Sequence, residues 1–203
     1  MAGMSLVTAI LEHPSVYRLW QAPFANKKLE PIFRHNDMTK IRRVLDVGCG
    51  PGVNTPHFTK ADYLGIDFNE QYIRDARQRF KRSFVLADIT QYPAGFDQRF
   101  DFILVNSILH HVELADTILV LSRLNALLTH DGHIHILELV RPEQSGFAQL
   151  LTRWDRGAYS RPISEWQQIF SDHFETVAFE PYEVRAFGIV LWNMIYFKGR
   201  AKQ

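Results

Sequence analysis

Residues Val44 to Gly52 have the sequence VLDVGCGPG, and this segment is the most informative about the fold. Its first half is the apolar run of a buried strand, and its second half is a loop with glycine at every second position. Glycine permits positive φ angles and lets the backbone approach a ligand closely. Asn54 or Thr55 can cap the helix that follows. We therefore expect a strand, a ligand-binding loop and a helix in this order, and a tight turn without a ligand is the alternative interpretation.

The next three predicted strands each end in a polar residue, namely Asp67, Asp88 and Asn106. An acid at the tip of the second strand, about 20 residues beyond the loop, accepts hydrogen bonds from a ribose diol. Asp88 suits an adenine amino group, and Ile89 can pack on the ring. Because the carboxyl ends of parallel strands share one edge of a sheet, these residues are expected to converge on the glycine loop. The pattern predicts a nucleoside cleft.

Short β-branched runs alternate with longer amphipathic stretches from about Ile41 to Val140, which is typical of a parallel sheet with crossover helices. The predicted strands are Arg43–Val47, Tyr63–Ile66, Phe84–Ala87, Phe100–Val105, His133–Val140, Phe174–Phe179 and Gly188–Phe197. The predicted helices are Asn54–Thr59, Asn69–Arg82, Val112–Leu128, Glu143–Arg156 and Ser164–Phe170, with Asp131 and Gly132 as the turn that ends the third. The fold class is therefore α/β.

The segment before Ile41 has a different pattern. Pro14, Pro23 and Pro31 each stand where a short helix can begin, so two or three short helices are predicted there. We expect one domain over residues 1–203, with a helical cap at 1–40, a Rossmann-like core at 41–203 and a lid or insert at 141–172.

The amino-acid composition limits which kinds of protein this chain can be and which partners it can bind. The chain has 203 residues, 46% of them hydrophobic and 22% charged, with a formal net charge of +1. This near-neutral balance lacks the basic field that binds phosphate backbones, so no nucleic-acid partner is expected. The single cysteine excludes an internal disulfide and fits a cytoplasmic location. We expect no signal peptide and no membrane span, and the sequence predicts no oligomeric state.

The charge around the loop distinguishes between nucleotide cofactors. Dinucleotide-binding loops follow the spacing Gly-x-Gly-x-x-Gly and hold a pyrophosphate on backbone amides. Here the spacing is Gly-x-Gly-x-Gly, and Asp46 stands just ahead of it. An acid at this place repels phosphates but suits a cationic amino-acid group. S-adenosylmethionine carries an ammonium and a sulfonium and has no phosphate, so the pattern favours it over NAD.

In these motifs the chain resembles the class I S-adenosylmethionine-dependent methyltransferases. The resemblance covers about Ile41 to Val140, and it includes the segment Leu104–Val112 after the fourth strand. It implies a Rossmann-like, doubly wound, seven-stranded mixed sheet whose last strand is antiparallel. It also implies S-adenosylmethionine as cofactor and S-adenosylhomocysteine as product.

Matched position by position, the resemblance assigns roles around this cofactor. Asp46, Gly48, Gly50 and Gly52 are expected to line its methionine part, with Cys49 packing beside it as a small residue. Asp67 is expected to hold the ribose hydroxyls with Phe68 against the adenine, Asp88 and Ile89 to frame the adenine, and Asn106 to close the floor.

The acceptor side is predicted from residue types near the strand ends. His110 is the candidate acid or base or substrate ligand, with His111 as a second candidate. The candidate substrate-binding residues are Tyr17, Glu138, Arg141, Trp154 and Tyr159. Trp154 and Tyr159 belong to the segment Arg153–Pro162, which is predicted to form a lid or a salt-bridged surface loop. His133 and His135 lie away from the ligand edge, so no metal site is expected.

The sequence thus predicts transfer of a methyl group to an oxygen, nitrogen or carbon of a small molecule. Two alternatives remain open. An NAD-dependent dehydrogenase is disfavoured by the loop spacing, and a protein that binds S-adenosylmethionine without transferring its methyl group is compatible with the same motifs.

Overall fold

The computed structural model describes residues 14–91, 99–141, 159–186 and 188–202, with the side chains of residues 14–23 outside the description. The helices are α2 (Pro14–His35), α3 (Glu70–Arg79), α4 (Leu114–Leu127) and α6 (Ile163–His173), with 3-10 turns η1 (Thr55–Phe58) and η2 (Leu109–His111). The strands are β1 (Arg43–Val47), β2 (Asp62–Asp67), β3 (Ser83–Leu86), β4 (Phe100–Asn106), β5 (Leu128–Leu139), β6 (Phe174–Ala186) and β7 (Ile189–Ala201).

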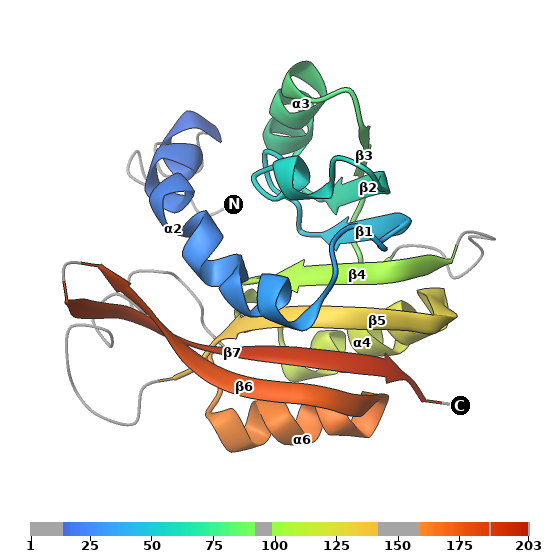
Figure 1. Cartoon of the computed structure of the whole chain (residues 1–203), viewed down its shortest axis with the longest axis vertical. Coiled ribbons are helices and arrows are strands. Elements are labelled where there is room, and N and C mark those ends of the chain that lie inside the picture. The colour runs from blue at the N-terminus through green and yellow to red at the C-terminus, as the bar shows by residue number, and fades with distance from the viewer. Residues whose placement is uncertain (1–13, 92–98, 142–158, 187, 203) are drawn as a thin grey trace, which may run out of the picture.

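The strands form one sheet in the order β3-β2-β1-β4-β5-β7-β6 (Figure 1). The first five are parallel to one another, and β7 pairs antiparallel with both β5 and β6. The predicted seven-stranded mixed sheet with an antiparallel last strand is therefore confirmed. The strand order reverses between β1 and β4, and open α/β sheets bind ligands outside the carboxyl ends of the strands at such a point.

Alternating side chains of the sheet build two cores, one on each face. Leu45, Ile103 and Ile195 face the helices α4 and α6, whereas Val44 and Leu104 face α2, η1 and α3. Figure 1 shows α2 on the face of the sheet opposite to α4 and α6. Because both faces are covered, the strands are apolar on both sides, as the sequence pattern predicted.

The region before the sheet differs from the prediction. A single helix, α2, runs from Pro14 to His35 in place of two or three short ones. Only Pro14 begins a helix, and Pro23 and Pro31 lie inside it. Each internal proline removes one backbone hydrogen bond, but packing of the helix retains it, since Pro31 and its neighbours Leu29 and Ile32 are buried against the sheet.

The hairpin of β6 and β7 holds α2 in place. Lys27 Nζ donates to the carbonyl of Arg185 at 2.8 Å, and Tyr182 Oη donates to the carbonyl of Lys28 at 2.8 Å. Phe24 packs edge-on against Trp192 with ring centroids 5.2 Å apart. These contacts fix the helix beside the extended end of the hairpin (Figure 1).

Two further local predictions are wrong. The segment predicted as the helix Asn54–Thr59 forms only the 3-10 turn η1, because Asn54 makes no capping hydrogen bond and turns its amide toward a strand. Asp131 and Gly132 lie within β5. The β4–β5 register shifts between Phe100 and Phe102, so these residues form a bulge and not a turn after the helix. The predicted helix 143–156 falls outside the described residues.

Candidate functional site

The glycine loop after β1 is a compact turn whose own amides are already bonded. Gly48, Gly50 and Gly52 have φ angles of 66°, 55° and 79°. The amides of Gly48 and Cys49 both donate to the carbonyl of Ile66, at 2.8 and 3.0 Å. Gly50 N donates to Asp67 Oδ2 at 2.8 Å, and Gly52 N donates to the carbonyl of Cys49 at 3.1 Å. Since residue 51 is proline, every N–H from 48 to 52 has a partner inside the protein.

Two of these glycines stand where no side chain fits. A Cβ on Gly48 would lie 2.5 Å from Ile108 Cγ2, and a Cβ on Gly52 would lie 2.8 Å from the ring of Phe80. The alternating spacing of the loop is therefore fixed both by backbone conformation and by close packing.

Asp67 joins the loops that follow the first two strands. Its Oδ2 accepts from Gly50 N, and its Oδ1 accepts from Asn69 N at 2.8 Å. Burial raises the pKa of Asp67, although backbone hydrogen bonds from Asn69, Gly50 and Phe68 oppose this shift. A carboxylate offers about four lone-pair sites, so both oxygens retain capacity for a further donor at the sheet edge.

Asp46 is a fully buried carboxylate on β1 that is held by neutral groups. Tyr63 Oη donates to it at 2.6 Å, and the amide of Asn54 donates at 3.2 Å. Burial raises the pKa of Asp46 to about 7, against the effect of these two hydrogen bonds, and the charge of Asp67 adds to the rise. Within the described residues no cation pairs with Asp46. The site is thus suited to an ammonium group.

Asn54 extends this network to the end of β4. The amide of Asn106 donates to Asn54 Oδ1 at 3.4 Å, and Ser107 Oγ donates to Asn106 Oδ1 at 3.1 Å. Ser107 has a φ of 56°, an uncommon value for a residue other than glycine. The structure therefore brings Asp46 and Asn106 together through a residue that the sequence pattern had marked only as a helix cap.

The residues expected around an adenine ring lie at the end of β3 and just after β2. Asp88 is exposed, and its Oδ1 accepts from the backbone and the hydroxyl of Thr90, at 2.8 and 2.7 Å. Ile89 packs against the core, whereas Phe68 is 79% exposed. Cys49 is buried next to Gly65, and burial raises the pKa of its thiol.

A second polar cluster lies after β4, on the face of the sheet that carries α4 and α6. His110 Nδ1 is hydrogen-bonded to Glu138 Oε1, and the two side chains are 1% and 0% exposed. Glu138 also accepts from the amides of Leu109 and Leu139, each at 2.8 Å. Burial alone would raise the pKa of Glu138, but His110 and the backbone hydrogen bonds outweigh it and hold that pKa below its usual value.

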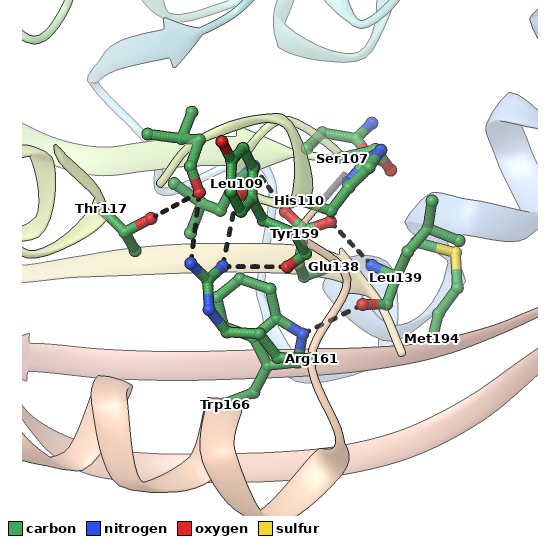
Figure 2. Close-up of polar contacts among 12 residues, drawn as sticks. Ser107, Leu109, His110, Thr117, Glu138, Leu139, Tyr159, Arg161, Trp166 and Met194 are labelled. Atoms are coloured by element: carbon green, nitrogen blue, oxygen red, sulfur yellow. Dashed lines mark hydrogen bonds and ion pairs between the residues drawn. The ribbon is translucent and has the colours of Figure 1, made fainter. Parts of the chain in front are cut away.

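Arg161 holds the same loop from the other side. Its guanidinium donates to the carbonyls of Leu109 at 3.4 Å and Val112 at 3.2 Å, and it stacks over the ring of Trp166 (Figure 2). Tyr159 N donates to the carbonyl of His110 at 3.0 Å. The sequence marked residues 153–162 as a lid or a surface loop, but Arg161 is only 5% exposed and serves as an internal anchor of η2.

Among the other residues predicted on the acceptor side, His111 and Tyr159 lie beside His110: the two histidine rings have centroids 4.0 Å apart, and Tyr159 N donates to the His110 carbonyl. Tyr17 lies on α2 with its side chain outside the description, and Trp154 lies outside the described residues. Arg141 and His111 are exposed. Tyr159 is 37% exposed and donates its hydroxyl to Glu113 at 2.8 Å.

The histidines of β5 take part in packing. His135 is buried, stacks on Phe102 with centroids 3.9 Å apart, and pairs through Nδ1 with Tyr196 Oη at 3.0 Å. Burial lowers its pKa well below the usual value. In the part of the chain that the structure describes, no three His, Cys, Asp or Glu side chains are placed to hold a metal ion. No described helix is long and apolar enough to cross a membrane.

Comparison with known families and proteins gives one consistent result. Residues 44–132 match the family model described as a methyltransferase domain. An uncharacterized methyltransferase of Mycobacterium tuberculosis is 33% identical over 133 residues, which cover 61% of this chain and 64% of that protein. A trans-aconitate 2-methyltransferase of Delftia acidovorans is 32% identical over 122 residues, or 56% of this chain and 45% of that enzyme. The aligned part of the chain thus spans less than two thirds of these relatives.

Solved structures share the fold over nearly the whole chain. The plantazolicin methyltransferase BpumL, in complex with S-adenosylhomocysteine, has a TM-score of 0.71 at 16% identity and covers 98% of this chain and 91% of its own. The N-methyltransferase NodS of Bradyrhizobium japonicum has a TM-score of 0.68 at 17% identity, with coverages of 89% and 98%.

Proposed function

Because this chain belongs to the class I S-adenosylmethionine-dependent methyltransferases, we propose that it transfers a methyl group from S-adenosylmethionine to a small molecule. The nucleophile is an oxygen, nitrogen or carbon atom of that acceptor. One observation carries the proposal. The glycine turn, whose N–H groups are all hydrogen-bonded within the protein, lies next to Asp46, a buried carboxylate without a cationic partner in the described structure.

The residues of this edge fit the proposed cofactor. Asp46 lacks a cationic partner in the described structure, and the ammonium of S-adenosylmethionine would supply one. Ile108 and Phe80 fill the space beside Gly48 and Gly52, so the turn next to Asp46 can carry no side chain at these two positions. A pyrophosphate would need free amides on this turn, but all of its N–H groups already have acceptors. The geometry therefore supports S-adenosylmethionine over NAD.

The nucleoside part would extend toward the ends of β2 and β3. In this proposal the free lone pairs of Asp67 accept from the ribose hydroxyls. Asp88 and Ile89 frame the adenine, Phe68 closes over it, and Asn106 forms the floor. Asp67 is supported most strongly, because its two backbone hydrogen bonds orient the carboxylate before any ligand arrives.

The acceptor site is proposed beyond the ends of β4 and β5. Relatives that are named for trans-aconitate methylation support a small-molecule acceptor. The cap of residues 1–40, which contributes Tyr17, and the segment 141–172, which contributes Arg141, Trp154 and Tyr159, would enclose it. The lone cysteine agrees with a location in the cytoplasm.

For methyl transfer the protein mainly has to position the acceptor and to exclude water. The sulfonium of the bound cofactor supplies an activated methyl group. The chain would hold the acceptor in line with that group and remove a proton where the nucleophile carries one. His110 is proposed as this proton acceptor, with His111 as a less buried second candidate.

Ligand-dependent thermal unfolding tests the cofactor assignment. S-adenosylmethionine or S-adenosylhomocysteine at about 100 times its dissociation constant should stabilise the protein by about 2.7 kcal/mol, and NAD should not. Asp67→Asn should remove most of this effect. The exposed Asp62→Asn, on the same strand, is the matched control and should retain it.

The opposite outcomes have clear meanings. Stabilisation by NAD alone would identify a dinucleotide-binding protein. Stabilisation by S-adenosylmethionine without release of S-adenosylhomocysteine, in the presence of any acceptor pool, would identify a protein that binds the cofactor without transferring its methyl group.

A further inference from the structure

The buried pair of His110 and Glu138 has a defined hydrogen-bond pattern. Both oxygens of Glu138 are occupied: Oε1 by His110 Nδ1 and by Leu139 N, and Oε2 by Leu109 N. An ionised carboxylate only accepts hydrogen bonds. The neutral imidazole must therefore carry its hydrogen at Nδ1, which leaves the lone pair at Nε2.

Nε2 of His110 is the unusual atom of this cluster. It is buried, and within the described part of the chain it has no hydrogen-bond partner. Native proteins leave few buried polar atoms unpaired, and those that remain so are often functional. The lone pair of such an atom can accept a hydrogen from a group placed against it.

Hydrogen bonds to the backbone around His110 keep its ring in contact with Glu138. Arg161 binds the carbonyls on both sides of it, at Leu109 and Val112, and Tyr159 N binds its own carbonyl. Glu138 holds the amide of Leu109 as well as the ring. Figure 2 shows these contacts converging on the one short loop. The His110 ring is thus held directly by Glu138, and its backbone is held by Arg161 and Tyr159.

We infer that Glu138 is a positioning residue that fixes His110 as a proton acceptor at Nε2, and that the methyl acceptor is a weakly acidic hydroxyl compound such as a phenol. This inference rests on the proposed methyl transfer. In the step, the hydroxyl oxygen forms a bond to the methyl carbon while the carbon–sulfur bond breaks and its electron pair stays on sulfur. The hydroxyl proton moves to Nε2, and the charge of Glu138 stabilises the resulting imidazolium.

The chemistry of other acceptors explains this choice. A carboxylic acid such as trans-aconitate is ionised near neutral pH, so its methylation needs no base. A phenol, with a pKa of about 10, is largely protonated at neutral pH and gains from a nearby imidazole. A buried imidazole with a dedicated carboxylate partner is therefore useful for a hydroxyl acceptor and superfluous for a carboxylate.

Nuclear magnetic resonance of the full wild-type chain tests the tautomer without any variant of Glu138. The protein is labelled with ¹⁵N-histidine and saturated with S-adenosylhomocysteine, and His110→Gln identifies the resonances. We expect a protonated Nδ1 and an unprotonated Nε2 at pH 8. A proton on Nε2 in the neutral ring overturns the inference.

Turnover with defined probes tests the acceptor class. Methyl-labelled S-adenosylmethionine is offered with catechol, 4-methylphenol, benzoate or trans-aconitate. Transfer to a hydroxyl probe supports the inference, and Glu138→Gln should then lower kcat by about 100-fold or more with KM nearly unchanged. The exposed Glu175→Gln is the matched control and should retain wild-type turnover.

The outcomes separate this inference from the function on which it rests. Transfer to the carboxylates, or to neither hydroxyl probe, overturns the acceptor class, as does a Glu138→Gln protein with undiminished kcat. In each case binding of S-adenosylhomocysteine by wild type and Glu138→Gln shows that the cofactor site is intact. Failure of the wild type to bind it removes the proposed function itself.

Discussion

Asp46 and Glu138 are both completely buried carboxylates of this sheet, yet their surroundings differ in kind. Asp46 faces the side covered by α2 and is held by two neutral donors, and burial raises its pKa to about 7. Glu138 faces the side covered by α4 and α6, where His110 and two amides hold its pKa below the usual value. Equal burial thus leads to opposite charge preferences, because the partners decide which form is stable.

Asp46 therefore belongs to an incomplete site, which still lacks a charged partner, and Glu138 belongs to a complete one. Asp46 gains a charged partner only when a cation arrives, whereas Glu138 already accepts hydrogen bonds from His110, Leu109 and Leu139. In terms of the proposed function, the first carboxylate recognises the cofactor and the second organises a side chain of the protein.

The largest expected effect comes from breaking the complete site. Glu138→Ala should lower the free energy of unfolding by about 3–5 kcal/mol, because it leaves the His110 ring and two buried amides without their acceptor. Urea unfolding at pH 7 measures this loss. A loss below about 1 kcal/mol would contradict the picture of a buried carboxylate that accepts hydrogen bonds from His110 and from two amides.

Removal of the charge of Asp46 should raise the free energy of unfolding, which is the opposite of the effect of Glu138→Ala. The pKa of Asp46 rises from 3.8 to about 7 on folding, so its contribution to stability is complete below about pH 4 and is lost as the pH rises to 7. Asp46→Asn should therefore gain stability relative to wild type by about 2–3 kcal/mol between pH 5 and 7.5.

Paired unfolding curves of wild type and Asp46→Asn across this range measure the difference. The subtraction cancels the titration of the other groups, including His135 and Glu138. A difference that does not change with pH would show that Asp46 is ionised with an ordinary pKa.

A smaller effect is expected on ligand affinity. An ammonium favours the ionised form of Asp46, so S-adenosylhomocysteine should bind up to about 10-fold more tightly at pH 8 than at pH 6. Titration calorimetry at the two pH values measures the ratio. Asp46→Asn should bind more weakly and lose this dependence on pH, and equal pH dependence in both proteins would place the ammonium elsewhere.

The meeting of the glycine loop and the polar strand ends at one edge of the sheet could be predicted from the sequence because its signals are local. The glycine spacing at Val44–Gly52 and the polar ends of the next strands stand in short segments, and parallel pairing alone brings them to one edge. Gly50 N on Asp67 Oδ2 joins two of these predicted positions directly.

The second cluster depends on register, which the sequence does not display. His110 and Glu138 were both singled out, but their contact follows from the pairing of Asn106 with Leu137. The role of Arg161 was missed because an arginine in a polar segment resembles a surface residue. Its one signal was Trp166, five residues further along the chain, whose ring it covers.

The prolines of α2 misled the prediction for a related reason. Local propensity opposes a helix through Pro23 and Pro31, but burial of Leu29 and Ile32 and the contacts with the β6–β7 hairpin favour it. Tertiary packing outweighed the local preference, as it also did in shortening the helix expected at Asn54.

The carboxylate of Asp67 has one amide from each of two successive loops, Gly50 N and Asn69 N. The glycine turn is consequently not a transferable module. An engineer who moves residues 44–52 into another parallel sheet must also move an aspartate at the tip of the adjacent strand, or the transplanted turn will lack the anchor that shapes it.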